Sequence, residues 1–412
     1  MKTEKNITEA ENEIETENKN ESENKIENKI EIENRELEQL PEGSYTLIDV
    51  RDAEAAANGM IPGARSIFAG DLMEEQNIAT LPKDRTVILY CQKGTVSRGL
   101  VPLLREHGFD ACSLAGGYAA WALAGASGEC RAEEIEACIR GPFKKKLFTP
   151  FAKAITTYDL IQEQDKIAVC ISGGKDSMVM AKLFQELKRH NKFPFELVFL
   201  MMDPGYSPEN RRLIEQNARL LGIPLTIFES NIFDAVYEIE KSPCYLCARM
   251  RRGFLYSKAK ELGCNKIALG HHYDDVIETI LMGMLYGAQI QTMMPKLHST
   301  HFEGMELIRP MYLVREADIK RFRDENRLHF LQCACRFTDS CSVFADSDES
   351  ATSHKRAEVK RLIAELRKRN PYVEGNIFRS VENVNLSTII AYKKDGVKHF
   401  FTETYDNDRE AL

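Results

Sequence analysis

Short apolar runs separated by amphipathic stretches recur along most of the chain. In its first third, three such runs predict strands, at Thr46–Val50, Thr86–Tyr90 and Ala111–Leu114. A helical pattern over about 98–107 lies between the second and the third. Strands that alternate with helices at this spacing are typical of a parallel α/β layer, so we expect one such layer here.

A second series of the same kind follows further along the chain. Its predicted strands are Lys166–Ile171, Glu196–Met202, Leu225–Glu229 and Lys266–Gly270. Helical patterns lie beside them, at about 176–190, 208–221, 248–262 and 273–286. This alternation predicts a doubly wound α/β sheet, in which ligands bind at the carboxyl ends of the strands.

The remaining segments set the predicted domain limits. The first forty residues are rich in Glu, Asn and Lys and hold no aromatic residue, so they should be disordered or a frayed helix. After residue 315 the pattern is mostly helical. We therefore expect an acidic tail at 1–40, an α/β domain at 41–128, a linker at 129–145, a second domain at 146–380 and an extension at 381–412.

Charge is distributed unevenly between these segments. The whole chain carries 55 Lys and Arg against 63 Asp and Glu, a formal net charge of −8. The first forty residues hold 6 basic and 13 acidic residues, whereas residues 141–412 hold 40 and 36. The C-terminal two-thirds are slightly basic, which leaves room for a polyanionic partner such as nucleic acid.

Membrane and secreted proteins are disfavoured. No apolar run approaches the ~20 residues that span a bilayer, and the N-terminus has no apolar signal core. Eleven Cys without an export signal are typical of thiols or metal ligands in a reducing compartment. We therefore expect a cytoplasmic protein with no membrane partner.

A candidate phosphate-binding loop comes directly after the strand that ends at Ile171. Its sequence is Ser172-Gly173-Gly174-Lys175-Asp176-Ser177. The glycines let the backbone approach an anion, and the N–H groups of a following helix can bind it. Lys175 adds a positive charge, and Asp176 could face a magnesium ion. The loop resembles the PP-loop of ATP pyrophosphatases, which implies binding of ATP and Mg²⁺, cleavage to AMP and pyrophosphate, and adenylation of a carbonyl oxygen.

A second part of the nucleotide site is expected at the end of another strand. The segment is Gly270-His271-His272-Tyr273-Asp274-Asp275. The alternative interpretation of this segment is a structural turn in which Asp274 caps a helix. Asp203, at the end of the strand Glu196–Met202, is a weaker candidate for contacting the adenosine.

Cysteines form a third group of candidate residues. Cys244 and Cys247 lie three apart near the start of a predicted helix, where the helix dipole favours thiolates. The later thiols are Cys333, Cys335 and Cys341. Thiolates from separate segments can bind tetrahedral zinc or an iron–sulfur cluster, and the residues alone do not distinguish these two metal centres.

The segments around these residues resemble the tRNA 2-thiocytidine synthetases. The resemblance covers about 141–335 and is carried by Pro243–Gly253, Ala268–Asp275 and Ile308–Pro310. It implies tRNA as the substrate and a [4Fe-4S] cluster with one iron open for sulfide. The implied ligands are Cys244, Cys247 and Cys333, with Cys335 as the alternative third ligand and Cys341 as a weaker one.

The first α/β domain resembles a single rhodanese domain over about 38–125. The resemblance is carried by Asp49–Arg51, Ile61–Ala64, Tyr90-Cys91 and Leu114–Trp121. It implies that Cys91 carries a persulfide in a loop whose N–H groups cradle an anion and favour the thiolate. Val96 stands where the family usually has Arg, so Arg98 or Lys93 would supply the cation. An inactive docking domain is the alternative.

Together these features predict an ATP-dependent tRNA sulfurtransferase. ATP would adenylate the C2 carbonyl of a pyrimidine, with cytidine preferred, and sulfur from Cys91 would reach it through the cluster. Its partners would be tRNA and a cysteine desulfurase or another persulfide donor, and a homodimer stays open. The alternatives are a thiolase acting on tRNA uridine or a small carbonyl metabolite, and a non-catalytic sulfur-relay adaptor.

Three basic segments are candidates for binding tRNA phosphates. They are Lys144–Lys146, Arg249–Arg252 and Lys355–Arg369. Solvated helix faces are the alternative for such runs of charge.

Overall fold

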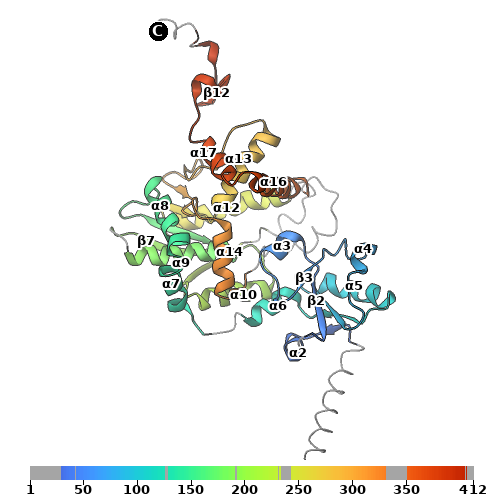
Figure 1. The fold of residues 1–412 in the computed structure, drawn as a ribbon. Helices are drawn as coiled ribbons and strands as arrows, with labels where there is room; N and C mark the ends of the chain where they lie inside the picture. The colour runs from blue at the N-terminus through green and yellow to red at the C-terminus, as the bar shows by residue number, and fades with distance from the viewer. Residues whose placement is uncertain are drawn as a thin grey trace, which may run out of the picture. The chain divides into compact units, whose positions relative to one another are not determined.

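The computed structural model describes residues 29–41, 43–125, 129–190, 193–230, 232, 243–330, 350–403 and 405. Side chains are described for all of these except 243–249 and 350–354. The chain, drawn in Figure 1, divides into two compact units. The first unit contains residues 1–272 and 295–350, and the second contains 273–294 and 351–412.

The N-terminal domain of the first unit is built on a five-stranded sheet in the order β1-β5-β4-β2-β3, with all neighbouring strands parallel. The strands are β1 (Glu31–Ile32), β2 (Tyr45–Asp49), β3 (Arg65–Ser66), β4 (Thr86–Tyr90) and β5 (Ala111–Leu114). The helices are α2 (Asn34–Gln39), α3 (Ala53–Ala57), α4 (Glu75–Ile78), α5 (Thr95–Glu106) and α6 (Gly117–Gly125). The predicted parallel α/β layer is confirmed.

This domain begins earlier than the sequence pattern indicates. Strand β1 pairs with β5, with Glu31 opposite Ser113, and helix α2 follows it. Ile32 and Leu37 are both buried. The expectation of a tail up to residue 40 therefore differs from the structure from residue 31 onward. A two-residue edge strand is too short to show a pattern of alternation in a polar segment.

Both faces of the N-terminal sheet are covered, as apolar parallel strands require. Val87 and Leu89 of β4 belong to an apolar cluster with residues of α5. Ile88 and Tyr90 of the same strand belong to another cluster, which includes Tyr118 of α6. Successive side chains of a strand point to opposite faces, so this alternation holds one helix layer on each side.

The second domain of the first unit carries a six-stranded sheet in the order β10-β11-β9-β6-β7-β8. The pair β10–β11 is antiparallel and the other pairs are parallel. The strands are β6 (Lys166–Ile171), β7 (Glu196–Asp203), β8 (Leu225–Glu229), β9 (Lys266–Ala268), β10 (Lys296–His298) and β11 (Glu306–Ile308). The helices are α7 (Ala132–Arg140), the π-helix η1 (Lys144–Phe148), α8 (Thr149–Thr157), α9 (Lys175–His190), α10 (Pro208–Leu220), α12 (Pro243–Glu261) and α14 (Glu316–Glu325).

Strand β6 shows how this sheet is covered on both faces. Ile167 and Val169 pack in an apolar cluster with residues of α7, α9 and α10. Ala168 and Cys170 pack on the opposite side with Tyr256 of α12. The predicted doubly wound sheet is therefore confirmed, and its central strand leads directly into the candidate phosphate loop.

The predicted linker at 129–145 is largely helical. It contains α7 and the start of η1. Ile135, Ile139 and Phe143 of this segment are buried in the same apolar cluster as the sheet. The sequence pattern suggests a connector because the apolar residues of this segment are widely spaced among charged ones. In a helix, however, residues at this spacing lie on one face and form a single apolar stripe.

The two domains of the first unit share apolar packing. Tyr118 and Ala122 of α6 belong to the same buried cluster as Ala218 of α10. The ring of Trp121 lies edge-on to that of His329, with centroids 4.4 Å apart. Burial lowers the pKa of His329, with a smaller contribution in the same direction from Arg323. The neutral imidazole can therefore pack against the indole.

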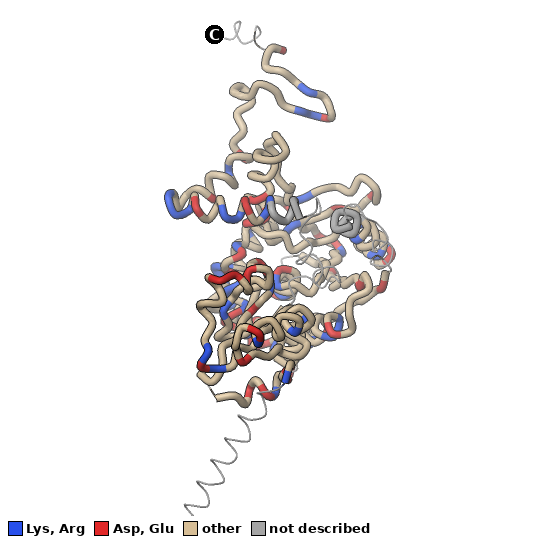
Figure 2. Tube along the Cα trace, turned by 90° about the vertical axis from the view of Figure 1, so that its right-hand side faces the viewer, with Lys and Arg blue, Asp and Glu red and all other residues tan. Residues whose placement is uncertain are grey.

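The second unit consists mainly of three helices, α13 (Tyr273–Gly287), α16 (Ser350–Arg369) and α17 (Val373–Ser380). Tyr273 stacks on Phe378, and Glu278 is paired with Arg356. Figure 2 shows Lys and Arg along α16. The hairpin of β12 (Ala391–Lys394) and β13 (Val397–Phe400), flanked by the 3₁₀ turns η2 (Leu386–Thr388) and η3 (Phe401–Glu403), was not anticipated by the sequence pattern. No helix among the described residues is both long and apolar enough to cross a membrane.

A buried ion pair fixes the end of β2. Arg51 Nη2 lies 2.6 Å from Asp49 Oδ2, and both side chains are buried. The Tyr90 hydroxyl donates to the same carboxylate at 3.0 Å, and Arg51 also donates to the carbonyl of Gly59. Burial opposes the charge on Arg51, but the hydrogen bond and charge of Asp49 outweigh it, so the pKa of Arg51 is raised.

Asp49→Asn is expected to lower the free energy of unfolding of this domain by about 3–5 kcal/mol, because it leaves a buried guanidinium without a counter-ion. Denaturant titration of the full chain would measure it. The control is Asp84→Asn, which removes an exposed carboxylate paired with Arg85 and should leave the transition unchanged. Equal transitions for the two variants would contradict the role of the ion pair.

Candidate functional site

The loop between β6 and α9 is closed by its two serines. Ser177 Oγ accepts a hydrogen bond from the Ser172 amide at 3.1 Å and donates to the Gly174 carbonyl at 3.0 Å. Gly173 has φ +86°, and a Cβ there would lie 2.5 Å from the side chain of Ile214. The loop therefore needs glycine at this position, both for its backbone and for its packing.

Lys175, the first residue of α9, is held between two carboxylates. It is 8% exposed, and its Nζ lies 3.0 Å from Asp176 Oδ2 and 3.0 Å from Glu316 Oε1. Burial lowers its pKa, but the two carboxylates outweigh this and raise the pKa overall. The ammonium is therefore charged and fixed at the helix N-terminus, where backbone N–H groups also favour an anion. Glu316 was missed by the sequence reasoning, because it comes from α14 and carries no local motif.

Asp176 fits a magnesium site. Its Oδ1 is buried and accepts no hydrogen bond from the described residues. Nε2 of His272 lies 3.9 Å from this oxygen. Magnesium in nucleotide sites takes one or two protein carboxylates together with phosphate oxygens, and this oxygen provides one such ligand.

The strand-end segment after β9 is brought against this loop. A Cβ on Gly270 would lie 3.2 Å from the Ser177 amide nitrogen, so the backbone passes close to the start of α9. His272 is buried beside Asp176. His271 precedes it in the same segment, whereas Asp274 and Asp275 lie in the first turn of α13, in the second unit. The structure thus joins Gly270 and His272 to the phosphate loop, as the topology predicts.

Asp203 has a structural role in its own turn. It is the last residue of β7, and its Oδ1 accepts from the amides of Gly205 and Tyr206. Its Oδ2 lies 3.0 Å from Nη1 of Arg211. Both oxygens are therefore engaged by residues of the following loop and helix. A contact with adenosine remains a sequence-based prediction.

The predicted cluster ligands lie at the edge of, or beyond, the described residues. Cys244 and Cys247 lie within the first turns of α12, and their side chains fall outside the described residues. Cys333, Cys335 and Cys341 fall outside them entirely. Three thiols as a donor set fit an iron–sulfur cluster or zinc. No group of three His, Cys, Asp or Glu among the described side chains could hold a metal ion.

Two further thiols of the second domain have a packing role. Cys170 and Cys264 are buried in the apolar cluster beneath α12. Burial raises the pKa of Cys170 to about 12. Such thiols are poor nucleophiles and poor metal ligands, as expected for cysteines in apolar strand contexts.

Cys91 lies in the corresponding loop of the N-terminal domain, between β4 and α5. Its Sγ lies 3.5 Å from Ser97 Oγ, which is also 2.8 Å from Ser113 Oγ. The Gly116-Gly117 turn packs on this loop, and a Cβ on Gly117 would lie 2.3 Å from the Cys91 carbonyl oxygen. The thiol thus sits at a helix N-terminus in a loop held by close backbone packing. Ser97 and Ser113 were not singled out from the sequence.

Two residues, Arg98 and Lys93, could supply the cation expected near Cys91, and their surroundings differ. Arg98 lies 3.6 Å from Glu31 of β1, and its side chain is largely exposed. Lys93 lies inside the loop and is half-buried. Val96 packs with the apolar cluster beneath α5. Lys93 is therefore the candidate that stays within the loop itself.

Comparison with known proteins assigns both domains. Residues 143–335 match the family model described as a PP-loop domain, and residues 33–124 match a rhodanese-like domain. The chain is 35% identical over 244 residues to the tRNA-cytidine(32) 2-sulfurtransferase of Anaeromyxobacter dehalogenans, covering 58% of this chain and 80% of that protein. It is 34% identical over 235 residues to the protein of the same name from Syntrophotalea carbinolica, covering 56% of this chain and 86% of that one.

One solved structure that is similar to this chain is the U34-tRNA thiolase NcsA of Methanococcus maripaludis with its [4Fe-4S] cluster. It is 22% identical, with 57% of this chain and 79% of that one covered and a TM-score of 0.45. The family resemblances found in the sequence are confirmed by the family models and the curated relatives. The chain, with a rhodanese-like domain ahead of its PP-loop domain, belongs to the family of tRNA-cytidine(32) 2-sulfurtransferases.

Proposed function

We propose that this protein is an ATP-dependent tRNA sulfurtransferase that replaces the C2 oxygen of a cytidine in tRNA by sulfur. The observation that carries the proposal is the phosphate loop, closed by Ser172 and Ser177 around a charged Lys175. It occurs in a chain 35% identical to a tRNA-cytidine(32) 2-sulfurtransferase. A loop of this kind serves chemistry on ATP, and the relatives' name supplies the second substrate.

The first half of the reaction uses the PP-loop. The N–H groups at the start of α9 and the Lys175 ammonium hold the phosphates of ATP, and Asp176 ligates Mg²⁺. The cytidine O2 attacks the α-phosphorus, the bond to the bridging oxygen breaks, and pyrophosphate leaves. C2 then carries an adenylated oxygen, which is a far better leaving group than oxide. Lys175 stabilises the charge that moves onto pyrophosphate.

The second half is a displacement at C2. Hydrosulfide attacks C2, the bond to the adenylated oxygen breaks, and AMP leaves with the original oxygen, while the proton goes to solvent. Cys244, Cys247 and Cys333 would hold a [4Fe-4S] cluster, with Cys335 as the alternative third ligand. A bound cluster supplies an iron coordination site that is open to sulfide. Zinc on the same thiols would be a structural site instead.

The rhodanese-like domain supplies the sulfur. Cys91 attacks the terminal sulfur of a persulfide on a donor protein such as a cysteine desulfurase, and the donor's thiolate leaves. The persulfide on Cys91 is anionic, so the N–H groups of the loop, the start of α5 and the Ser97 hydroxyl stabilise it. Reduction of its S–S bond by a thiol reductant releases hydrosulfide and restores Cys91.

Nucleoside mass spectrometry tests the substrate and the ATP step together. Bulk tRNA from a deletion strain should lack 2-thiocytidine, and the wild-type gene should restore it. The Lys175→Ala variant should not restore 2-thiocytidine, because loss of the fixed charge is expected to slow adenylation by about 10²-fold or more. The control is Lys83→Ala, an exposed lysine of the N-terminal domain. If 2-thiocytidine persists in the deletion strain, the proposed substrate is wrong.

Cys91→Ser should separate the two sulfur sources. Thiolation of tRNA with a persulfide donor is expected to fall at least tenfold, because the serine hydroxyl cannot carry sulfur. With free sulfide the rate should stay at the wild-type level. Cys130→Ser, which changes an exposed cysteine, serves as the matched control. Equal loss with both sulfur sources would show that Cys91 does not relay sulfur.

Cys244→Ala tests the metal centre. Anaerobically purified wild-type protein is expected to bind about four iron atoms per chain and to show the brown absorbance of a [4Fe-4S] cluster. The variant should lose both, whereas Cys130→Ser should keep them. Iron and zinc analysis of the same samples decides between the two centres, since zinc without iron in the wild type would contradict the cluster.

A further inference from the structure

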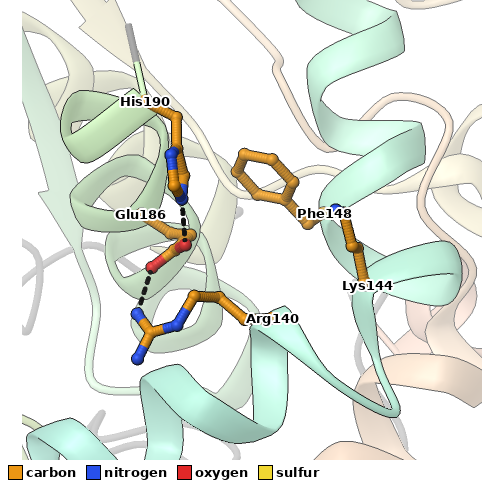
Figure 3. A pocket seen from close by; sticks show the side chains of 5 residues that line it. All are labelled: Arg140, Lys144, Phe148, Glu186 and His190. Atoms are coloured by element: carbon orange, nitrogen blue, oxygen red, sulfur yellow. Dashed lines mark hydrogen bonds and ion pairs between the residues drawn. The ribbon is translucent and has the colours of Figure 1, made fainter.

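A small pocket lies at the far end of α9 from the phosphate loop. Figure 3 shows its five lining residues, Arg140, Lys144, Phe148, Glu186 and His190. Helix α9 has 16 residues, so its two ends lie about 24 Å apart. The pocket is therefore separate from the site that binds ATP, and the proposed reaction leaves it without a role.

The π-helix η1 builds one wall of this pocket. Lys144 and Phe148 are its first and last residues, and both line the cavity. The Phe148 ring approaches that of His190, with centroids 6.3 Å apart. A π-helical turn is rare and is frequently found at functional sites. The pocket thus presents an aromatic ring and an ammonium group from one unusual turn.

The opposite wall carries a buried carboxylate whose charge is already balanced. Glu186 is 1% exposed, and its two oxygens accept from Arg140 Nη1 at 2.9 Å and from His190 Nε2 at 2.8 Å. Nη2 of Arg140 has no hydrogen-bond partner among the described residues. Lys144 forms no ion pair with a carboxylate of the described residues.

The charges around the pocket leave a positive excess. Among the lining residues, Arg140 and Lys144 are positively charged and Glu186 is negatively charged. Two positive groups against one negative group leave +1 before His190 is counted. The pocket therefore suits an anion, which would bind the Lys144 ammonium beside Phe148.

The size of the pocket restricts the ligand. Its volume is about 240 Å³, below the ~300–1,000 Å³ of sites that enclose a whole small molecule. A complete free nucleotide would not be enclosed, whereas one phosphate with part of the adjoining nucleoside would fit. Proteins bind RNA through contacts of this kind, in which a backbone phosphate is held by polar or charged groups and the adjoining nucleoside contacts an aromatic ring.

We propose that this pocket is a second anchoring site for tRNA, in which Lys144 binds a backbone phosphate and Phe148 contacts the adjoining nucleoside. The inference rests on the proposed function, which supplies tRNA as the substrate. The distance from the phosphate loop is short compared with a folded tRNA. Anchoring at this distance raises affinity without any contact with the reacting base.

The test compares three variants for tRNA binding over a range of salt, together with the KM for tRNA and for ATP in pyrophosphate release. Lys144→Glu should weaken tRNA binding about tenfold and reduce the slope of log K against log salt by about 1. Phe148→Leu keeps the apolar contact but loses the aromatic face, so it should weaken binding without changing the slope. The control Lys153→Glu makes the same charge change at an exposed position of α8 and should have a much smaller effect.

Each other outcome overturns the inference. If Lys144→Glu and Lys153→Glu weaken binding equally, only the general charge matters and the pocket is no anchor. If Lys144→Glu raises the KM for ATP and not for tRNA, the pocket serves a free nucleotide. If wild-type protein releases pyrophosphate in a tRNA-dependent way while all variants match it, this inference alone fails. A wild type with no tRNA-dependent release would instead overturn the proposed function.

Discussion

Parallel pairing of buried strands is the constraint on which both candidate sites depend. Strands β4 and β6 are apolar on both faces, so each is fixed in register between two helix layers. Parallel strands end at the same edge of a sheet, and the chain must leave that edge through a loop into a helix. Cys91 and Ser172 are the first residues of those two loops. Each site thus combines a strand end, a glycine and a helix N-terminus.

Two buried positive charges in the first unit are stabilised by ion pairs. Lys175 is stabilised by Asp176 and Glu316, and Arg51 by Asp49. Removing one partner from such a pair lowers the free energy of unfolding far more than the intact pair raises it. These groups therefore fix the local geometry more than they stabilise the fold. In the proposed reaction the pairing of Lys175 would have a functional consequence, because a charge held in place needs no reorganisation when phosphates bind. Glu316 would then act on the proposed nucleotide site through Lys175.

The two domains of the first unit fit a single sulfur pathway. The rhodanese-like domain provides a thiol at a helix N-terminus, which suits an anionic persulfide, and the PP-loop domain provides a site for activating a carbonyl oxygen with ATP. Shared apolar packing through α6, together with the contact between Trp121 and His329, joins the two domains. A thiolation enzyme needs both a sulfur source and an activated carbon, and this chain carries a candidate for each.

Local features of this protein could be predicted from its amino-acid sequence. The strand Lys166–Ile171, the phosphate loop and Cys91 at a strand end were all read from contiguous residues, because apolar runs and glycine loops are encoded locally. Contacts between distant segments, in contrast, became visible in the folded chain. Glu316 reaches Lys175 from α14, Ser113 reaches Ser97 from β5, and the pocket joins η1 to the end of α9. The short edge strand β1 likewise gains its stability from pairing with β5. Such contacts leave no periodic pattern in the sequence, because each depends on how elements pack rather than on the residues beside it.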